Sequence, residues 1–104
     1  MAAAEEAVRT DSRFALAFLY LGVGLFKMFE LDRAEAALKK AFELAPAVGQ
    51  VRLALANVYV KRGRYDMALE QLNRYLAENP GGKERPAAEE MRGKLLRAAE
   101  GEQK

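Results

Sequence analysis

Apolar residues recur along most of the chain at the three- and four-residue spacing of an amphipathic α-helix, and the pattern repeats itself. Landmarks of one stretch return 34 residues later: Ala34 returns as Ala68, and Pro46 returns as Pro80. A fixed period of this size, built from two helical stretches, is typical of stacked helix pairs. The sequence therefore predicts an all-α chain of antiparallel helix pairs, without strands.

The two repeats predict four helices, and a fifth amphipathic segment follows them. The expected ranges are 13–29 and 32–44, then 49–62 and 65–78, and a last helix that begins near residue 86. Pro86 suits the first turn of that helix, where amide hydrogens have no carbonyl partner within the helix. The glycine inside it, Gly93, is explained by a close approach to Tyr75 or by simple tolerance. The face expected to cover the last repeat consists of Ala88, Met91, Leu95 and Ala98.

The turn between the two helices of a repeat differs between the copies. Gly63 lies at the reversal in the second repeat, where glycine tolerates the left-handed conformation that such turns adopt. The residue 34 positions earlier is Phe29, with Phe26, Met28 and Leu31 close by. We expect Phe29 to fold inward over the turn, and the alternative is an exposed apolar contact patch.

The landmark residues resemble the consensus of the tetratricopeptide repeat family. The first copy contains Phe18-x2-Leu21-Gly22-x2-Leu25 and Ala34-x3-Leu38-x2-Ala41-x4-Pro46, and the second contains Arg52-x2-Leu55-Ala56-x2-Tyr59 and Ala68-x3-Leu72-x2-Tyr75-x4-Pro80. Small landmark residues let two helices approach closely, while the large apolar landmarks fill the remaining volume. Arg52 and Tyr75 depart from the family, which has a large apolar residue at the first position and a small one at the second. The resemblance implies an α-solenoid in which antiparallel helix pairs form a right-handed superhelix.

The 34-residue register divides the chain into five segments. Residues 1–11 are expected to be the end of a preceding repeat or an N-terminal cap helix, since Ala7 fits the register of a second helix while Ser12 replaces its closing proline. The alternative for this segment is a frayed tail. The other segments are repeat 1 at 12–48, repeat 2 at 49–82, a C-terminal capping helix at 83–99 and a disordered tail at 100–104.

Composition and charge exclude several classes of function. The chain has no cysteine and no histidine, which removes disulfides, thiolate chemistry and the commonest general base and metal ligand. The formal net charge of +2 is spread over alternating acidic and basic residues, so no basic stripe suited to nucleic acid stands out. No apolar run reaches the roughly 18 to 20 residues of a membrane span. We therefore expect a cytoplasmic protein that is not an enzyme, without catalytic residues, metal or other cofactor, and without nucleic-acid or membrane partners.

The resemblance also implies where a ligand binds, because in the family the first helix of each pair lines the concave side of the superhelix. The core stripe of the first helix is expected to contain Phe18, Leu21, Gly22 and Leu25, and the neighbouring stripe then faces the groove. The groove residues projected in this way are Leu16, Leu19, Val23, Phe26, Lys27, Leu53, Asn57, Val60 and Lys61. An apolar floor with one amide and two ammonium groups predicts a protein-protein interaction module or scaffold that binds a peptide with apolar anchors and an acidic group.

Other functions compete for the same residues. Family members that clamp the C-terminal carboxylate of chaperones use Lys and Asn at early groove positions, which Leu19 and Val23 occupy here. RNA-binding helical repeats have a slightly longer period and lack the closing prolines. The main alternative is a structural segment of a larger repeat array or a self-association module without its own peptide, since about three repeats are usually needed for stability.

Overall fold

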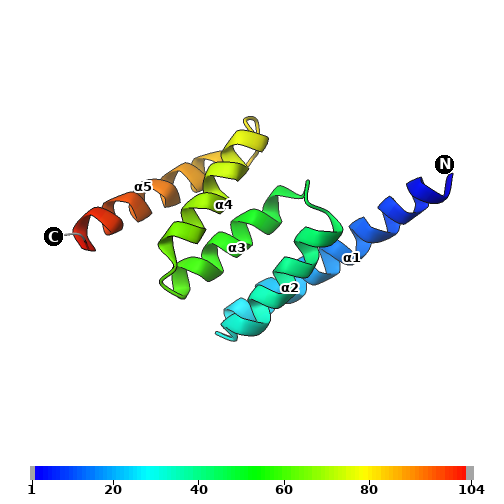
Figure 1. Cartoon of the computed structure of the whole chain (residues 1–104), viewed down its shortest axis with the longest axis horizontal. Coiled ribbons are helices and arrows are strands. Elements are labelled where there is room, and N and C mark those ends of the chain that lie inside the picture. The colour runs from blue at the N-terminus through cyan, green and yellow to red at the C-terminus, as the bar shows by residue number, and fades with distance from the viewer. Residues whose placement is uncertain (1, 103–104) are drawn as a thin grey trace.

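Five α-helices account for the described part of the chain (Figure 1). The computed structural model describes the backbone of residues 2–102 and the side chains of residues 13–98; Met1 of the expected N-terminal segment and residues 103–104 of the expected tail lie outside it. The helices are α1 (Ala2–Lys27), α2 (Leu31–Leu44), α3 (Gly49–Lys61), α4 (Tyr65–Glu78) and α5 (Arg85–Glu102). No strand is present among residues 2–102, and the all-α prediction is confirmed.

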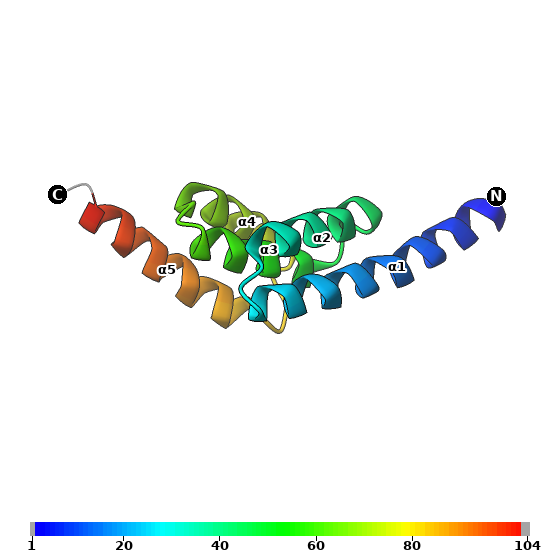
Figure 2. The same cartoon turned by 90° about the horizontal axis from the view of Figure 1, so that it is seen from below.

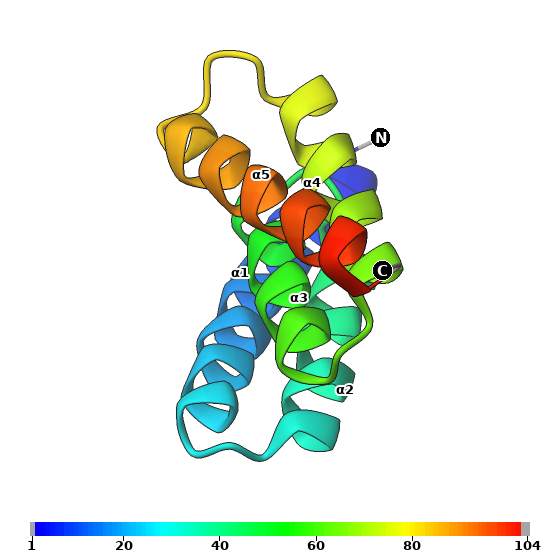
Figure 3. The same ribbon diagram turned by 90° about the vertical axis from the view of Figure 1, so that its left-hand side faces the viewer.

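The helices pack in the order of the chain. α1 packs against α2 and α3 against α4, the two pairs stack through contacts of α1 and α2 with α3, and α5 packs against α4. The molecule measures 56 × 31 × 18 Å, with α1 and α5 at opposite ends of its long axis (Figure 2). Figure 3 views the stack from the α5 end, with α1 and α2 behind. This arrangement confirms the predicted solenoid of helix pairs.

The first helix is longer than predicted, because α1 continues without a break from Ala2 to Lys27. The boundary expected between residues 11 and 12 therefore lies inside a helix. Alanine and glutamate dominate residues 2–7 and favour helix, and α1 contains no proline. Ser12 stands where a repeat has its closing proline, so the residue that would break the helix is missing. The N-terminal part of α1 consequently extends beyond α2 (Figure 2).

The two helices of the first repeat meet at Gly22. A Cβ atom on this glycine would lie 2.6 Å from both Cγ and Cδ2 of Leu38, closer than side chains tolerate. Leu38 itself is fully buried, as are the small landmarks of the other helices, namely Ala34, Ala56 and Ala68. The small residues therefore lie at helix contacts, as predicted, and they set how closely the helices approach.

Arg52, the first departure from the family pattern, is buried, and each of its three guanidinium nitrogens donates a hydrogen bond to a neighbour. Its guanidinium donates hydrogen bonds from Nε to Glu78 at 2.9 Å and from Nη1 to Gln71 at 3.0 Å. The Phe42 ring lies beside it, with 4.7 Å between the ring centroid and Cζ. Because the charge is paired, hydrogen-bonded and stacked on an aromatic face, burial at this position is tolerated.

Tyr75, the second departure, occupies space that two glycines leave open. A Cβ atom on Gly49 would lie 2.7 Å from Cε2 of the tyrosine ring, and one on Gly82 would lie 2.6 Å from its hydroxyl oxygen. The suggested contact of Gly93 with Tyr75 is wrong, since the atom nearest to a Cβ on Gly93 is Nη1 of Arg97 at 3.8 Å. Gly93 is thus tolerated in α5 and not required by a close neighbour.

Both helix-pair turns close with the same hydrogen-bond pattern. In the first turn the amide of Phe29 donates to the carbonyl of Phe26, and the amide of Glu30 donates to that of Leu25, both at 2.9 Å. The second turn repeats both bonds around Gly63. This pairing defines the Schellman motif, in which the residue after the helix adopts the left-handed conformation. The φ angle is accordingly +63° at Phe29 and +74° at Gly63.

The expectation that Phe29 folds inward is wrong, because its side chain is 68% exposed. The backbone conformation of the turn explains its direction. A Cβ atom built on the equivalent Gly63 has no atom within 4 Å, so a side chain at this turn position projects into open space. The alternative expectation, that Phe29 is part of an exposed apolar patch, is therefore the one that agrees with the structure.

The last helix packs its predicted apolar face against the second repeat. Ala88 and Leu95 are buried in the common core, and Met91 is partly buried against it, while Ala98 is exposed. α5 continues to Glu102, so the tail expected from residue 100 is helical as far as it is described. Alanine, arginine and glutamate favour this continuation, and the one glycine near the end costs only about 1 kcal/mol.

Replacing Gly22 by leucine should lower the free energy of unfolding by about 1–3 kcal/mol, because the added side chain overpacks the contact with Leu38. Ala56→Leu should cost a similar amount, since Ala56 is fully buried. Urea titrations measure both effects. Lys40→Leu on the exposed side of α2 is the control, expected to stay within about 0.5 kcal/mol of the parent. Equal losses at all three positions would contradict the packing register.

Replacing Phe29 by glycine should raise the free energy of unfolding by about 1 kcal/mol, because glycine adopts positive φ without a steric penalty. The reciprocal change Gly63→Phe should lower it by about 1–2 kcal/mol through the same penalty. Urea unfolding of the two variants measures this matched pair. A Phe29→Gly variant less stable than the parent would show that the exposed ring makes a stabilising contact.

Candidate functional site

A small pocket lies where α1 faces α3, and we call it the groove pocket. Its volume is about 190 Å³, and it is lined by Val23, Phe26 and Lys27 of α1, Leu38 of α2, and Ala54 and Asn57 of α3. Phe26 and Lys27 follow Val23 by three and four residues, and Asn57 follows Ala54 by three, so each set lies on one side of its helix. The pocket therefore combines apolar walls with one amide and one ammonium group.

Four of the nine predicted groove residues line this pocket, namely Val23, Phe26, Lys27 and Asn57. Leu53 and Val60 are partly buried against the core. Lys61 and Leu16 are exposed and do not line the pocket. The structure thus brings together the middle of the predicted set and leaves its outer members apart.

The predicted assignments of Leu19 and Leu21 are the reverse of what the structure shows. Leu19, expected in the groove, is only 5% exposed and belongs to the core, whereas Leu21, expected in the core, is 50% exposed. Leu19 belongs to the core that α1 shares with the helices packed against it, α2 and α3. Leu21 corresponds to Leu55, which is 3% exposed because the first helix pair packs against α3. No described helix precedes α1, so Leu21 stays open.

The polar groups of the groove have no partner among residues 13–98. The side-chain amide of Asn57 forms no hydrogen bond there. Neither Lys27 nor Lys61 forms an ion pair with a side chain of that range. These groups can therefore bind a ligand without breaking a side-chain contact within that range.

The size of the groove pocket limits what enters it. Pockets for drug-sized ligands measure roughly 300–1,000 Å³. A volume of about 190 Å³ suits one apolar side chain better than a whole small molecule. Such a side chain would contact Val23 and Phe26, and the amide of Asn57 could both donate to and accept from the backbone that carries it.

A second polar region joins α2 to the end of α3 through ion pairs. Arg62 donates a hydrogen bond to Asp32, its Nε lies 3.6 Å from Glu35, and Glu35 also pairs with Lys39 at 2.9 Å. The hydrogen bond from Arg62 holds the pKa of Asp32 below its ordinary value, and the bond with Glu35 raises the pKa of Lys39. Burial raises the pKa of the Tyr59 hydroxyl. Opposite charges neutralise one another here, which is the pattern of a structural network and not of a proton-transfer site.

Neither a metal centre nor a membrane span emerges from the part of the chain that the structure describes. Its acidic side chains do not converge in any group of three that could hold a metal ion. Within the same residues no helix has the length and apolar character needed to cross a bilayer. The groove pocket is the candidate site because four of the predicted groove residues line it.

Two residues of the groove pocket, Leu38 and Ala54, were not predicted. Ala54 lies three residues before Asn57, so helical spacing alone places it on the same face. Leu38 belongs to α2 and is a buried landmark of the repeat, so its sequence position indicates core packing only. Its second role as the floor of the pocket follows from the close approach of α2 to α1.

Comparison with known proteins concerns the repeats that build this pocket. Residues 25–95 match the sequence model of a family described as tetratricopeptide repeat. This range is more than half of the 104-residue chain and spans α2, α3 and α4 completely. A search of curated protein sequences gave no significant match.

Proposed function

This chain belongs to the tetratricopeptide repeat family, and we propose that it binds a peptide segment of a partner protein in the groove between α1 and α3. Members of the family are generally protein-protein interaction modules and typically non-catalytic scaffolds. The proposal includes that the chain is not an enzyme, uses no cofactor, and has a protein as its partner in preference to nucleic acid or membrane.

The observation that carries the proposal is the groove pocket together with its polar groups. Val23 and Phe26 offer an apolar recess the size of one side chain, and Asn57 and Lys27 stand beside it without a side-chain partner among residues 13–98. In the free protein, water satisfies the amide and the ammonium group. A bound peptide replaces that water with backbone hydrogen bonds and a carboxylate while its anchor fills the recess.

The positions of Lys27 and Lys61 make the two ends of the groove electrostatically different. Lys27 is the last residue of α1 and Lys61 the last residue of α3, so both ammonium groups belong to the same end of their helices. A carboxylate of the peptide is expected at that end, and the apolar anchor beside Val23 and Phe26. This polarity distinguishes one orientation of the peptide from the other.

Phe26→Ala should weaken binding of a peptide selected on this protein from a random-sequence library by about 2 kcal/mol, roughly thirtyfold, as expected for a buried interface aromatic. Asn57→Ala should weaken binding of the same peptide, because the hydrogen bonds between Asn57 and the peptide backbone are lost. Lys61→Glu should act mainly on the association rate and its dependence on salt. Calorimetric titration gives the affinities, and stopped-flow fluorescence gives the rates.

Phe14→Ala and Lys83→Glu are matched controls for these variants. Both side chains are exposed and lie outside the groove pocket, so the peptide affinity should not change. One outcome would contradict the proposal: Phe26→Ala unfolds the protein while the molecules that remain folded keep their affinity. Phe26 would then be a core residue, and a purely structural role would replace peptide binding.

One observation favours a second candidate function, a segment of a larger repeat array or a self-association module. α1 exposes the side that is buried on α3, since Leu21 is open where Leu55 is covered. Gly24 is likewise exposed, although the equivalent Val58 is fully buried. On α3, the preceding helix pair packs against this side. The equivalent side of α1 is therefore suited to contact a further helix pair.

If a second copy of the chain fills this side, the sedimentation coefficient should rise with protein concentration. Leu21→Glu should abolish the rise, because it places a charge within the apolar face. Leu96→Glu on the exposed side of α5 is the control and should leave the rise unchanged. A parent chain that stays monomeric at high concentration would contradict self-association and leave the larger array as the second candidate.

A further inference from the structure

The turn between α1 and α2 carries a side chain that costs folding free energy. Phe29 holds φ at +63°, in the left-handed region where a Cβ atom meets the following carbonyl oxygen. Gly63, in the equivalent turn, adopts +74° without that penalty. The Phe29 ring is mostly exposed, so burial offsets little of the cost. Residues held in such strained backbone conformations cluster at binding sites and switches.

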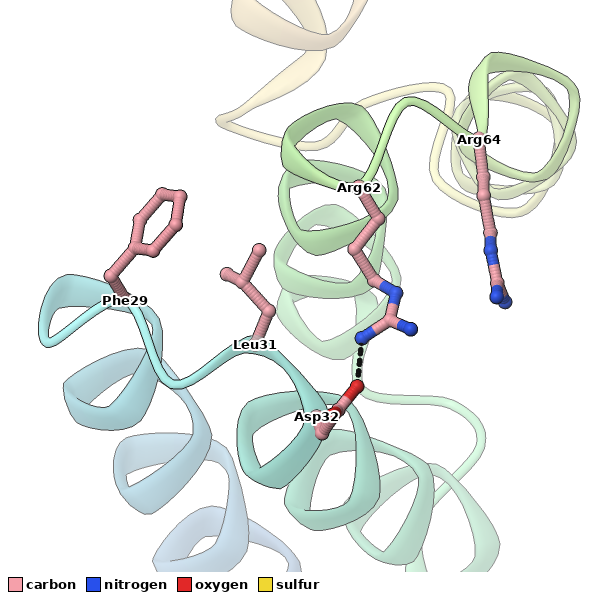
Figure 4. Close-up of a pocket in the computed structure, with 5 residues that line it drawn as sticks. All are labelled: Phe29, Leu31, Asp32, Arg62 and Arg64. Atoms are coloured by element: carbon pink, nitrogen blue, oxygen red, sulfur yellow. Dashed lines mark hydrogen bonds and ion pairs between the residues drawn. The ribbon is translucent and has the colours of Figure 1, made fainter.

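The ring borders a shallow pocket of about 420 Å³, which we call the turn pocket and which is lined by Phe29, Leu31, Asp32, Arg62 and Arg64 (Figure 4). In Figure 4 the two apolar side chains stand on one side and the two arginines on the other. Met28, the neighbour of Phe29 in sequence, is 71% exposed and adds to the apolar surface of this turn. The turn pocket shares no residue with the groove pocket.

The charges of the turn pocket are not balanced. Asp32 accepts a hydrogen bond from Nη1 of Arg62, so these two groups are occupied with each other. Arg62 also lies 3.6 Å from Glu35. The side chain of Arg64 forms neither an ion pair nor a hydrogen bond with any side chain in the range 13–98. The pocket therefore offers one guanidinium without an ion pair in that range, which lies beyond Arg62 on the side away from Phe29 and Leu31 (Figure 4).

We propose that the turn pocket binds a segment of a partner protein in which an aromatic or aliphatic side chain stands beside a carboxylate. The apolar side chain packs on Phe29 and Leu31, and the carboxylate pairs with Arg64, whose planar guanidinium can donate two parallel hydrogen bonds. A simple anion would satisfy Arg64 but leave the Phe29 ring uncovered. An acidic segment without an apolar side chain therefore uses only half of the surface. Because the two pockets have no residue in common, this binding does not depend on the groove.

Two synthetic peptides provide the test: acetyl-Glu-Phe-Glu-Leu-amide and the charge-reversed acetyl-Lys-Phe-Lys-Leu-amide. Each is titrated to millimolar concentration into the nitrogen-15-labelled full chain. The acidic peptide should shift the backbone amide resonances of Phe29, Glu30 and Arg64, and the basic peptide should shift none of them. Unchanged resonances of Phe29 and Arg64 with the acidic peptide, or equal shifts of them with both peptides, would overturn the proposal.

Two variants separate binding from folding. Phe29→Gly relieves the left-handed strain and stays folded, yet its affinity for the acidic peptide should fall about tenfold or more. The Arg64→Glu variant should no longer bind the acidic peptide and should bind the basic one instead. A merely structural role of Arg64 would not produce this exchange. Lys83→Glu, on the surface outside both pockets, should leave both affinities unchanged. Undiminished affinity of Phe29→Gly for the acidic peptide, or an Arg64→Glu variant that still prefers it, would overturn the proposal.

Discussion

The contact of Leu38 with the backbone at Gly22 sets the distance between α1 and α2, and the groove depends on that distance. A single Cβ atom at Gly22 would come within 2.6 Å of Leu38, so the spacing relies on the absence of one methyl group. The same leucine is fully buried and forms the floor of the groove pocket. The proposed binding surface thus rests on a core residue. Any change that moves α1 away from α2 alters the pocket as well as the core.

The ends of the stack differ from its middle because each helix pair contacts only its neighbours. On α3 the landmark Leu55 is covered by the first repeat, whereas the equivalent Leu21 on α1 has no described helix against it. At the other end α5 covers α4 through Ala88 and Leu95. One repeated pattern therefore yields buried positions in the middle of the array and an open surface at its N-terminal side.

Charge pairing separates groups with a structural role from groups available to a partner. Arg62 and Asp32 bind each other between α3 and α2 and tie the two repeats together. Lys27 and Arg64 have no such partner among residues 13–98 and lie in two separate pockets, one in the groove and one at the turn. An extended stack exposes both surfaces at once, which is how solenoids provide large binding areas.

The 34-residue period determined by itself the helix pairs and the small residues at their contacts, because helical spacing and side-chain volume are local properties of the sequence. The resemblance to the family, projected onto these helices, also predicted four residues of the groove pocket, namely Val23, Phe26, Lys27 and Asn57. Only the tertiary structure decided that Leu19 is buried and Leu21 open, since that depends on which helices pack against α1. It likewise decided that Phe29 points outward, because the φ angle of the closed turn, and not the apolar character of the ring, sets the direction of its Cβ atom.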